Sequence, residues 1–306
     1  MIFSISANLH KFDNYCNISV KSQTDSDRLR SYSNILTNST FNNLVRNHNK
    51  SYLLSTINKY DKELLIGNHL TYKDYFSYIY SVLKSHYRSE YIYKNYLITK
   101  MLSTESFSSD FTILNEFKIN KSIADLVLIN GTTRVLEIKT ALDDSRRLSS
   151  QINDYKKAFK EICIVTHFSL ADKYLKITDK SIGIIAINDN SLDTIREPME
   201  NNSFDNTVII KCLRKAEYTQ IIYNYFGYLP ESTDFNFFRE CVKMFQKIPS
   251  GKLHDMMVQE LKKRIVRERM VFLSQEVPDE IKHICFCLNF KKDEYQVLNK
   301  ILAEKL

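Results

Sequence analysis

The sequence predicts an α/β fold, with a mixed sheet in the middle of the chain and helical additions at both ends. Short apolar runs of strand length recur between residues 112 and 188, and a longer segment with helical spacing separates two of them. Before and after this region, apolar residues recur mainly at helical spacing. With 306 residues, of which 43% are hydrophobic, the chain can form one large domain or a core with helical additions.

Residues 1–83 are predicted to form an N-terminal helical extension. The first 30 residues are polar and stay unassigned, apart from a β-like patch around Cys16–Val20. Apolar spacing then predicts one helix over residues 53–60 and another over 72–83, separated by Gly67 and Asn68.

The next segment, residues 84–103, is predicted to be a helix that leads into the sheet. Glu90 lies on or beside its apolar face, where a carboxylate is unusual, and Lys94 follows four residues later. Glu90 therefore either approaches a functional site or forms a surface ion pair with Lys94. A strand over residues 112–119 carries Glu116, which is either an extra acidic ligand or, as we favour, an exposed residue.

Two further strands, residues 123–129 and 133–140, carry three charges in otherwise apolar runs. Asp125 lies in the first strand, and Glu137 and Lys139 share one face of the second. Two carboxylates about 4 Å apart repel by roughly 4 kcal/mol at an effective dielectric constant of 20. A divalent cation would offset this repulsion. The alternative is a buried ion pair between Lys139 and one carboxylate.

The connection between these strands decides whether the carboxylates can meet. Asn130-Gly131 is typical of a two-residue turn, which would put Asp125 and Glu137 on opposite faces of the sheet. A three-residue connection pairs Ile129 with Thr133 and sets the two carboxylates opposite each other. We therefore expect an odd-length connection or a bulge.

The elements after the hairpin complete the predicted sheet. Residues 143–160 are predicted to form a helix, on which Arg147, Gln151 and Tyr155 lie four apart in one row. A strand over residues 162–167, a helix over 170–177 and a strand over 182–188 follow.

The spacing D-(x11)-E-x-K, formed by Asp125, Glu137 and Lys139, resembles the PD-(D/E)XK nuclease superfamily, also called restriction-endonuclease-like. Ala124 stands where the motif's name has Pro. The predicted order of elements matches the superfamily core, αβββαβ, over roughly residues 90–188, and we assign residues 84–225 to this core. Gln151-x-x-x-Tyr155 resembles the motif that follows E-x-K in the RecB-like branch. The chain is also similar to a poorly characterised bacterial branch of the superfamily.

This resemblance implies an Mg²⁺- or Mn²⁺-dependent nuclease that acts on DNA. It implies a metal held by Asp125, Glu137 and the carbonyl of Ile138, because hard oxygen ligands suit Mg²⁺ or Mn²⁺. Five residues have implied catalytic roles: Asp125, Glu137, Lys139, Gln151 and Glu90. Arg147 and Tyr155 are implied to bind the nucleic acid.

Two alternatives stay open. One is a non-catalytic protein that keeps this fold for binding, such as an immunity or regulatory protein. Such proteins usually lose one of the signature residues, and this chain has all three. The other is a nuclease for RNA or single strands.

The segment after residue 188 is predicted to be a polar loop with some helix near Leu192, followed by a strand over residues 207–213. Residues 226–306 are predicted to form a C-terminal helical region. One of its helices, from Leu253 to about Ser274, contains a run of basic residues. Lys262, Lys263 and Arg264 in this run either contact phosphates or form a solvated face.

Composition sets the remaining expectations. The net charge of +7 and a pI near 8.9 suit a polyanionic partner. Six cysteines without a C-x-x-C pair predict free thiols in the cytoplasm, and no apolar run is long enough to span a bilayer. The 19 Tyr and 18 Phe are scattered through apolar patterns, which does not indicate a base-stacking platform. We expect no membrane partner, and a homodimer is possible.

Overall fold

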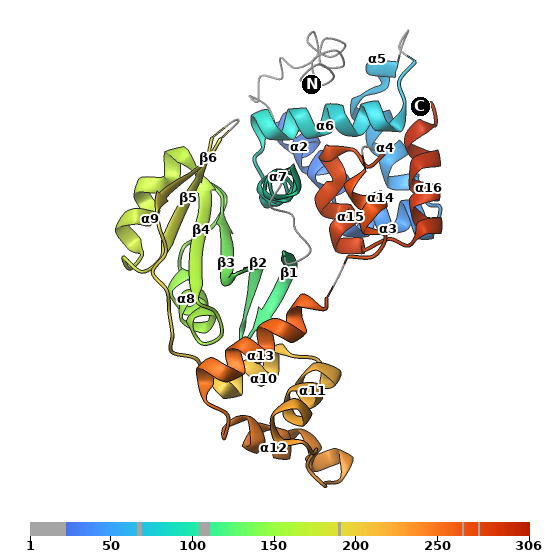
Figure 1. Ribbon diagram of the computed structural model, residues 1–306. Coiled ribbons are helices and arrows are strands. Elements are labelled where there is room, and N and C mark those ends of the chain that lie inside the picture. Colours follow the sequence, from blue (N-terminus) through green and yellow to red (C-terminus); the bar gives the residue numbers. More distant parts are fainter. Residues whose placement is uncertain (1–22, 66–68, 104–110, 189–190, 265, 275) are drawn as a thin grey trace. The chain divides into compact units, whose positions relative to one another are not determined.

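The computed structural model describes residues 23–65, 69–103, 111–188, 191–264, 266–274 and 276–306. The chain forms two compact units: unit 1 comprises Met1–Ser103 and Val266–Leu306, and unit 2 comprises Thr104–Ile265 (Figure 1). This division differs from the three parts expected from the sequence, with boundaries after residues 83 and 225. The helices between residues 226 and 265 belong to unit 2, and the C-terminal helices belong to unit 1.

Unit 1 is helical in its described residues. Its helices are α2 (Gln23–Ile35), α3 (Asn38–Arg46), α4 (Ser51–Tyr60), α5 (Lys62–Leu65), α6 (Tyr72–His86), α7 (Glu90–Ser103), α14 (Arg269–Leu273), η2 (Asp279–Ile281), α15 (Lys282–Leu288) and α16 (Lys292–Ala303). The helices predicted over residues 53–60 and 72–83 are confirmed as α4 and α6. A capping box between Thr71 and Asp74 starts α6.

Two helix boundaries in and beside unit 1 correct the sequence predictions. The helix predicted over residues 84–103 is the end of α6 followed by α7, because Tyr87 leaves helical geometry with ψ of 73°. The helix predicted from Leu253 to Ser274 is likewise two helices, α13 (Ser250–Lys262) in unit 2 and α14 in unit 1. The β-like patch at Cys16–Val20 and the separators Gly67 and Asn68 lie outside the described residues.

A buried polar network links the helices of unit 1. The Asp61 carboxylate, whose side chain is fully buried, accepts hydrogen bonds from Arg28 Nη2 at 2.6 Å, Tyr32 OH at 2.6 Å and Tyr75 OH at 2.7 Å. Arg28 also donates to Tyr78 OH at 2.9 Å. We call Asp61, Arg28, Tyr32 and Tyr75 the Asp61 network. It ties α2 and α6 to the end of α4.

Unit 2 is built on a six-stranded mixed sheet with strand order β1-β2-β3-β4-β5-β6. The strands are β1 (Thr112–Ile119), β2 (Ser122–Asn130), β3 (Thr132–Lys139), β4 (Glu161–His167), β5 (Gly183–Ile187) and β6 (Leu192–Arg196). β1, β2 and β3 pair antiparallel, β3, β4 and β5 pair parallel, and β6 returns antiparallel to β5. The predicted mixed α/β class with helical flanks is therefore confirmed.

The described part of unit 2 also contains seven helical segments. They are α8 (Leu148–Lys156), η1 (Phe168–Leu170), α9 (Ala171–Ile177), α10 (Asn206–Cys212), α11 (Lys215–Phe226), α12 (Asp234–Phe245) and α13. α8 contacts β2 and β4, α9 contacts β4 and β5, and α10 contacts β1. Figure 1 shows α10 to α13 grouped together at one end of unit 2.

Three element predictions in unit 2 are wrong. The helix expected from residue 143 begins only at Leu148, because Asp143 instead accepts hydrogen bonds from the backbone N–H and hydroxyl of Thr140. The strand predicted over residues 207–213 is α10, which Asp205 caps through the N–H groups of Thr207 and Val208. The helix expected near Leu192 is the edge strand β6.

The β2–β3 hairpin has the register that the carboxylates require. Ile129 pairs with Thr133 and Asn130 with Thr132, so Gly131 alone makes the turn, with φ of 69°. The predicted odd-length connection is confirmed. Counting along the strands from Ile129 and Thr133 sets Asp125 opposite Glu137 on the same face of the sheet.

Candidate functional site

Both strand ladders around Asp125 are interrupted. The β2–β3 pairs end at Leu126 and Leu136, one residue before Asp125 would meet Glu137. On the other side, the β1–β2 pairs skip Glu116 and Asp125, and Glu116 has a φ of 48°. Positive φ is uncommon for a residue with a Cβ and costs of order 1–2 kcal/mol. The sheet therefore opens beside Asp125, and the backbone of Glu116 at this opening is strained.

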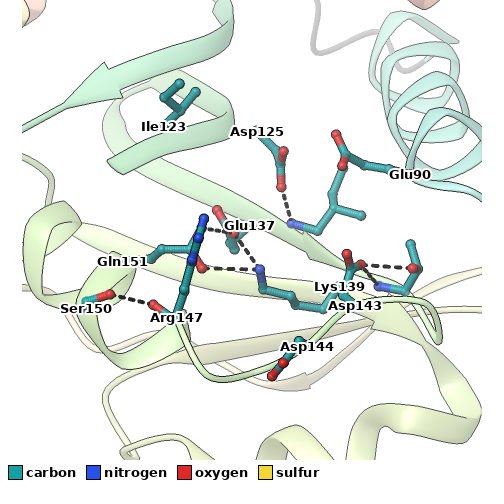
Figure 2. Close-up of polar contacts among 12 residues, drawn as sticks. Glu90, Ile123, Asp125, Glu137, Lys139, Asp143, Asp144, Arg147, Ser150 and Gln151 are labelled. Atoms are coloured by element: carbon teal, nitrogen blue, oxygen red, sulfur yellow. Dashed lines mark hydrogen bonds and ion pairs between the residues drawn. The ribbon is translucent and has the colours of Figure 1, made fainter. Parts of the chain in front are cut away.

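The Asp125 carboxylate takes the place of a missing backbone acceptor. Its Oδ2 accepts a hydrogen bond from the N–H of Ile138 at 2.7 Å (Figure 2). In a strand, the N–H and C=O of one residue point to the same side. The carbonyl of Ile138 therefore also faces the opening between β2 and β3. This orientation is the one that a role for Ile138 as a backbone ligand would require.

Glu137 is the centre of a side-chain cluster. Its side chain is buried, and its Oε1 accepts hydrogen bonds from Lys139 Nζ at 2.8 Å and from Gln151 Nε2 at 2.7 Å. Tyr155 OH lies 2.7 Å from Oε2 and 2.9 Å from the carbonyl oxygen of Ile123. The single hydroxyl hydrogen has two acceptors here. We call Asp125, Glu137, Lys139, Gln151 and Tyr155 the Glu137 cluster.

Lys139 is held on two sides. Nζ also donates to Oε1 of Gln151 at 3.2 Å, so the Gln151 amide donates to Glu137 and accepts from Lys139 (Figure 2). The carbonyl of Lys139 accepts from the Thr166 hydroxyl on β4 at 2.7 Å. The bond from Thr166 thus holds the backbone of Lys139, and the bond to Gln151 on α8 holds its ammonium group beside the Glu137 carboxylate.

The cluster brings two carboxylates to the same face of the sheet. Asp125 and Glu137 lie on neighbouring strands, and Lys139 contacts Glu137. Burial, and next the Glu137 carboxylate, raise the pKa of Tyr155 far above its ordinary value, so its hydroxyl stays a neutral hydrogen-bond donor. Two carboxylates close together inside a sheet repel each other, and a cation would offset this repulsion.

The oxygen atoms of the cluster fit a hard divalent cation. A carboxylate offers about four lone-pair sites, and the side-chain contacts described above use three of those on Glu137. Mg²⁺ is commonly bound by one or two carboxylates, with water completing its shell. Within the described residues, no group of three or more His, Cys, Asp or Glu gathers where it could hold a metal ion. A metal here would rest on two carboxylates and backbone oxygen.

Helix α8 is held in place by a contact that the sequence did not predict. Asp154 accepts hydrogen bonds from Asn120 Nδ2 at 2.8 Å and Ser122 Oγ at 2.9 Å, at the turn between β1 and β2. Burial alone would raise the pKa of Asp154, but these hydrogen bonds and the one from Lys157 lower it below its ordinary value. These hydrogen bonds position Gln151 and Tyr155 over β3. Asp154 is more than 30 residues away from Asn120 and Ser122 in the sequence, so no local sequence signal predicts the contact.

Arg147 lies at the beginning of α8, and its side chain is exposed. Figure 2 shows it extending from the helix start toward Glu137 and Gln151. The row of Arg147, Gln151 and Tyr155 expected on one side of α8 is therefore present, and two of its three members contact Glu137.

Five of the residues considered from the sequence are not members of the Glu137 cluster: Glu90, Glu116, Lys262, Lys263 and Arg264. Glu90 begins α7 in unit 1, is half exposed, and pairs with Lys94 Nζ at 2.5 Å. Lys94 is buried, so this is not the surface pair of the alternative expectation, and a catalytic role for Glu90 stays a prediction. In unit 2, Arg264 forms an ion pair with Glu217 at 2.6 Å, and its guanidinium also lies over the ring of Phe117.

The remaining basic residues of α13 and the acidic residue of β1 are at the surface or close to it. Lys263 is exposed and pairs with Glu260 at 2.6 Å. Phosphate contact by Lys262 and Lys263 stays a prediction. Glu116 is exposed, as we expected.

A separate cavity of about 400 Å³ lies beside α8. Its lining residues are Ser145, Leu148, Ser149, Ile152, Asn153, Lys156, Ile177, Thr178, Asp179 and Ile182. None of them belongs to the Glu137 cluster, which uses Gln151 and Tyr155 on a different side of the helix. The candidate site is thus the opening between β2 and β3, and this cavity is distinct from it.

Fold and site together define a mixed α/β protein with a carboxylate–lysine cluster at an opening in its sheet. Residues 83–284 match the family described as bacteriophage P4 protein cII, and the chain belongs to this family. A curated relative is protein cII of Enterobacteria phage P4. It is 23% identical over 185 residues, which cover 58% of this chain and 69% of the relative.

The likeness of this chain to a solved structure is weaker. It is to a protein of unknown function from Silicibacter pomeroyi, which is 12% identical in sequence. The match covers 39% of this chain and 82% of that chain, with a TM-score of 0.28. A likeness of this size does not establish a shared fold. Among the helices within the described ranges, none combines the length and apolar character needed to cross a membrane.

Proposed function

We propose that this protein is a nuclease that uses Mg²⁺ or Mn²⁺ to hydrolyse phosphodiester bonds, with DNA as its substrate. The observation that carries the proposal is the Glu137 cluster. Lys139 and Gln151 meet on one carboxylate oxygen, and Asp125 lies opposite on the neighbouring strand. Two carboxylates on the same face of the sheet suit a site for a divalent cation.

Each residue has a role that follows from its contacts. Asp125 and Glu137 would hold the cation, which lowers the pKa of water and offsets negative charge on the phosphate. Lys139 Nζ, fixed at 2.8 Å from Glu137, would donate to the developing negative charge. Gln151 would keep Lys139 and Glu137 in register, and the exposed Arg147 would contact a phosphate of the substrate.

The proposal extends to the restriction-endonuclease-like core. The mixed sheet, the antiparallel β1–β2–β3 run, the parallel β3–β4 pair and the intervening α8 support it. The mild positive charge of the whole chain is compatible with a nucleic-acid substrate.

The test is a cleavage assay on linear, circular and single-stranded DNA and on RNA, each with Mg²⁺, Mn²⁺ or EDTA. Asp125→Asn and Lys139→Met should lower the cleavage rate by at least about 100-fold. Asparagine is preferred to alanine because its carbonyl can still accept from Ile138 N–H, so folding is preserved. Asp179→Asn is the matched control, since Asp179 also accepts a backbone N–H, from Ser181, outside the cluster.

The assay distinguishes three outcomes that would change the proposal. Cleavage that persists in Asp125→Asn and Lys139→Met would place the activity elsewhere in the chain. If the wild-type protein cleaves no substrate and Mg²⁺ or Mn²⁺ does not raise its melting temperature, the non-catalytic alternative replaces the nuclease. Cleavage of RNA or single strands alone would correct the substrate.

A further inference from the structure

Unit 2 exposes a dense group of large apolar side chains far along the chain from the Glu137 cluster. Within 16 residues, six of them are at least 40% exposed: Tyr223, Tyr225, Tyr228, Leu229, Phe235 and Phe238. Phe235 is 94% exposed. Single exposed apolar residues are common, but six within one short segment, on two helices that contact each other and on their connection, indicate an interaction surface. We call these six residues the aromatic surface.

Three of the five aromatic rings in this surface, those of Tyr225, Tyr228 and Phe238, contact a neighbouring ring. The ring of Phe226 lies 4.8 Å from that of Tyr225 and 6.2 Å from that of Tyr228. Phe238 contacts the ring of Tyr218 edge-on at 5.6 Å. Phe235 and Phe238 are three residues apart on α12 and so lie on the same side of the helix. Tyr225, Tyr228 and Phe238 are therefore partly ordered by neighbouring rings, and Phe235 adds a ring that is almost fully exposed.

Exposed charges in the chain segment that carries this surface are mainly positive. Between residues 211 and 247, six basic side chains are exposed: Lys211, Arg214, Lys215, Arg239, Lys243 and Lys247. Three acidic side chains in the same range are not buried, Glu231, Asp234 and Glu240. One of them, Glu240, is already paired with Lys243 at 2.8 Å and Arg239 at 3.6 Å. The partner of this surface is therefore expected to be negatively charged.

The combination of rings and lysines favours a nucleic acid over a protein. Protein–protein interfaces are enriched in aromatic residues but depleted in lysine, and four of the six basic residues here are lysines. Exposed aromatic faces next to positive charge are the features that bind unpaired nucleic-acid strands, because each base can stack on a ring. Lys215 Nζ lies 5.3 Å from the centre of the ring of Phe237, a partly buried residue of α12 next in sequence to Phe238.

We propose that the aromatic surface of α11 and α12 binds a single-stranded nucleic acid by stacking unpaired bases on its rings. The sequence alone did not indicate a stacking platform. The structure separates the exposed aromatic residues of this segment from the buried ones elsewhere. The surface shares no residue with the Glu137 cluster, so this binding does not depend on catalysis by that cluster.

The test measures binding of the full chain to fluorescein-labelled oligonucleotides of about 20 nucleotides by fluorescence anisotropy in EDTA. The probes are oligo-dT, oligo-rU and a DNA duplex. In the double variant Tyr228→Ala/Phe235→Ala, the Kd for single strands should rise at least about fivefold for each lost stack. Binding to the duplex should be weaker from the start and change little. Oligo-dT and oligo-rU together show whether the strand is DNA or RNA.

Single variants distinguish stacking from general apolar contact. Phe235→Trp should keep single-strand binding, whereas Phe235→Leu, which keeps apolar area but lacks a ring, should weaken it. Tyr52→Ala is the matched control, because Tyr52 is a similarly exposed aromatic residue on α4 of unit 1. Unchanged melting temperatures would show that the substituted surface residues do not affect folding.

Two results would overturn the proposal. One is unchanged single-strand affinity in Tyr228→Ala/Phe235→Ala. The other is a wild-type dimer that the double variant converts to monomer, as seen by sedimentation, with single-strand binding unaffected; the surface would then join two copies. Loss of single-strand binding in the double variant would support the inference even if no cleavage activity is found. Failure of the proposed nuclease function would thus be seen separately.

Discussion

Asp61 in unit 1 and Glu137 in unit 2 are both buried carboxylates that accept three hydrogen bonds from side chains. Asp61 accepts them from Arg28, Tyr32 and Tyr75. Glu137 accepts them from a lysine, a glutamine and a tyrosine of its cluster. The number of hydrogen bonds is the same, so satisfaction of the carboxylate does not distinguish the two regions.

The difference between them is the number of carboxylates. In the Asp61 network, one carboxylate meets one guanidinium. In the Glu137 cluster, Asp125 brings a second carboxylate to the same face of the sheet as Glu137. The strand pairing around Asp125 is also interrupted, and the backbone of Glu116 beside it is strained. One carboxylate with one guanidinium forms a structural ion pair, whereas two carboxylates at an opening in a sheet are suited to a bound cation.

The largest effect that separates the two regions is expected from neutralising each carboxylate. Asp61→Asn leaves the Arg28 guanidinium without its partner, which should cost about 3–5 kcal/mol of unfolding free energy, toward the lower value because Arg28 is 21% exposed. Glu137→Gln keeps an acceptor oxygen for Lys139, and Lys139 also keeps its hydrogen bond to Gln151, so the cost should be less than about 2 kcal/mol. Urea denaturation measures both, and native-state hydrogen exchange assigns each loss to its unit. Equal losses would contradict the expected difference between the two regions.

The second comparison uses alkaline pH. Burial, and next the Asp61 carboxylate, raise the pKa values of Tyr32 and Tyr75 far above the ordinary value, as burial and Glu137 do for Tyr155. Above about pH 10, the unfolded chain loses these protons while the folded chain keeps them, so stability falls as pH rises. Each tyrosine contributes about 1 kcal/mol between pH 10 and 11, and a slope that approaches about 1.4 kcal/mol per pH unit at higher pH.

Substitution by phenylalanine removes these slopes. The double variant Tyr32→Phe/Tyr75→Phe should lose about 2 kcal/mol of the wild-type decline in stability between pH 10 and 11, and Tyr155→Phe about half as much. Urea denaturation between pH 10 and 11 measures the slopes. An unchanged slope in either variant would mean that the tyrosine ionises as readily in the folded chain as in the unfolded one.

The smallest expected effect tests the strain beside Asp125. Glu116→Gly should raise the unfolding free energy by about 1 kcal/mol, because glycine adopts positive φ without a steric penalty. Lys118→Gly, at an exposed position on the same strand, is the matched control and should lower it by about 0.5–1 kcal/mol. Thermal denaturation measures both. Similar losses in the two variants would show that the Glu116 backbone stores no strain.

The strands were predictable from their apolar runs, and the hairpin register was predictable from the requirement that two carboxylates meet. β1 was predicted with its observed bounds, since its apolar residues leave little choice, and β2 to β5 were predicted to within about two residues. The hairpin register followed from the requirement that Asp125 and Glu137 share a face, which overrode the turn preference of Asn130-Gly131.

The remaining features depend on contacts that the local sequence does not contain. Val208, Ile209 and Ile210 are consecutive buried β-branched residues, so α10 has the composition of a strand. β6 is an edge strand whose residues are mostly exposed, so it lacks the alternation of a half-buried strand. Arg264 belongs to a run of basic residues, and only its long-range ion pair with Glu217 reveals its structural role.

The division of the chain into two units has a consequence for synthesis on the ribosome. Unit 2 is one continuous segment that ends at Ile265, whereas unit 1 needs Val266–Leu306 to join helices made much earlier. Translation of these 41 residues, from 266 to 306, takes about 2–8 s at roughly 5–20 residues per second. During that interval the sheet can already fold, while the earlier helices still lack the C-terminal segment. Premature termination after unit 2 would therefore release a chain with a foldable sheet and an unfinished helical unit.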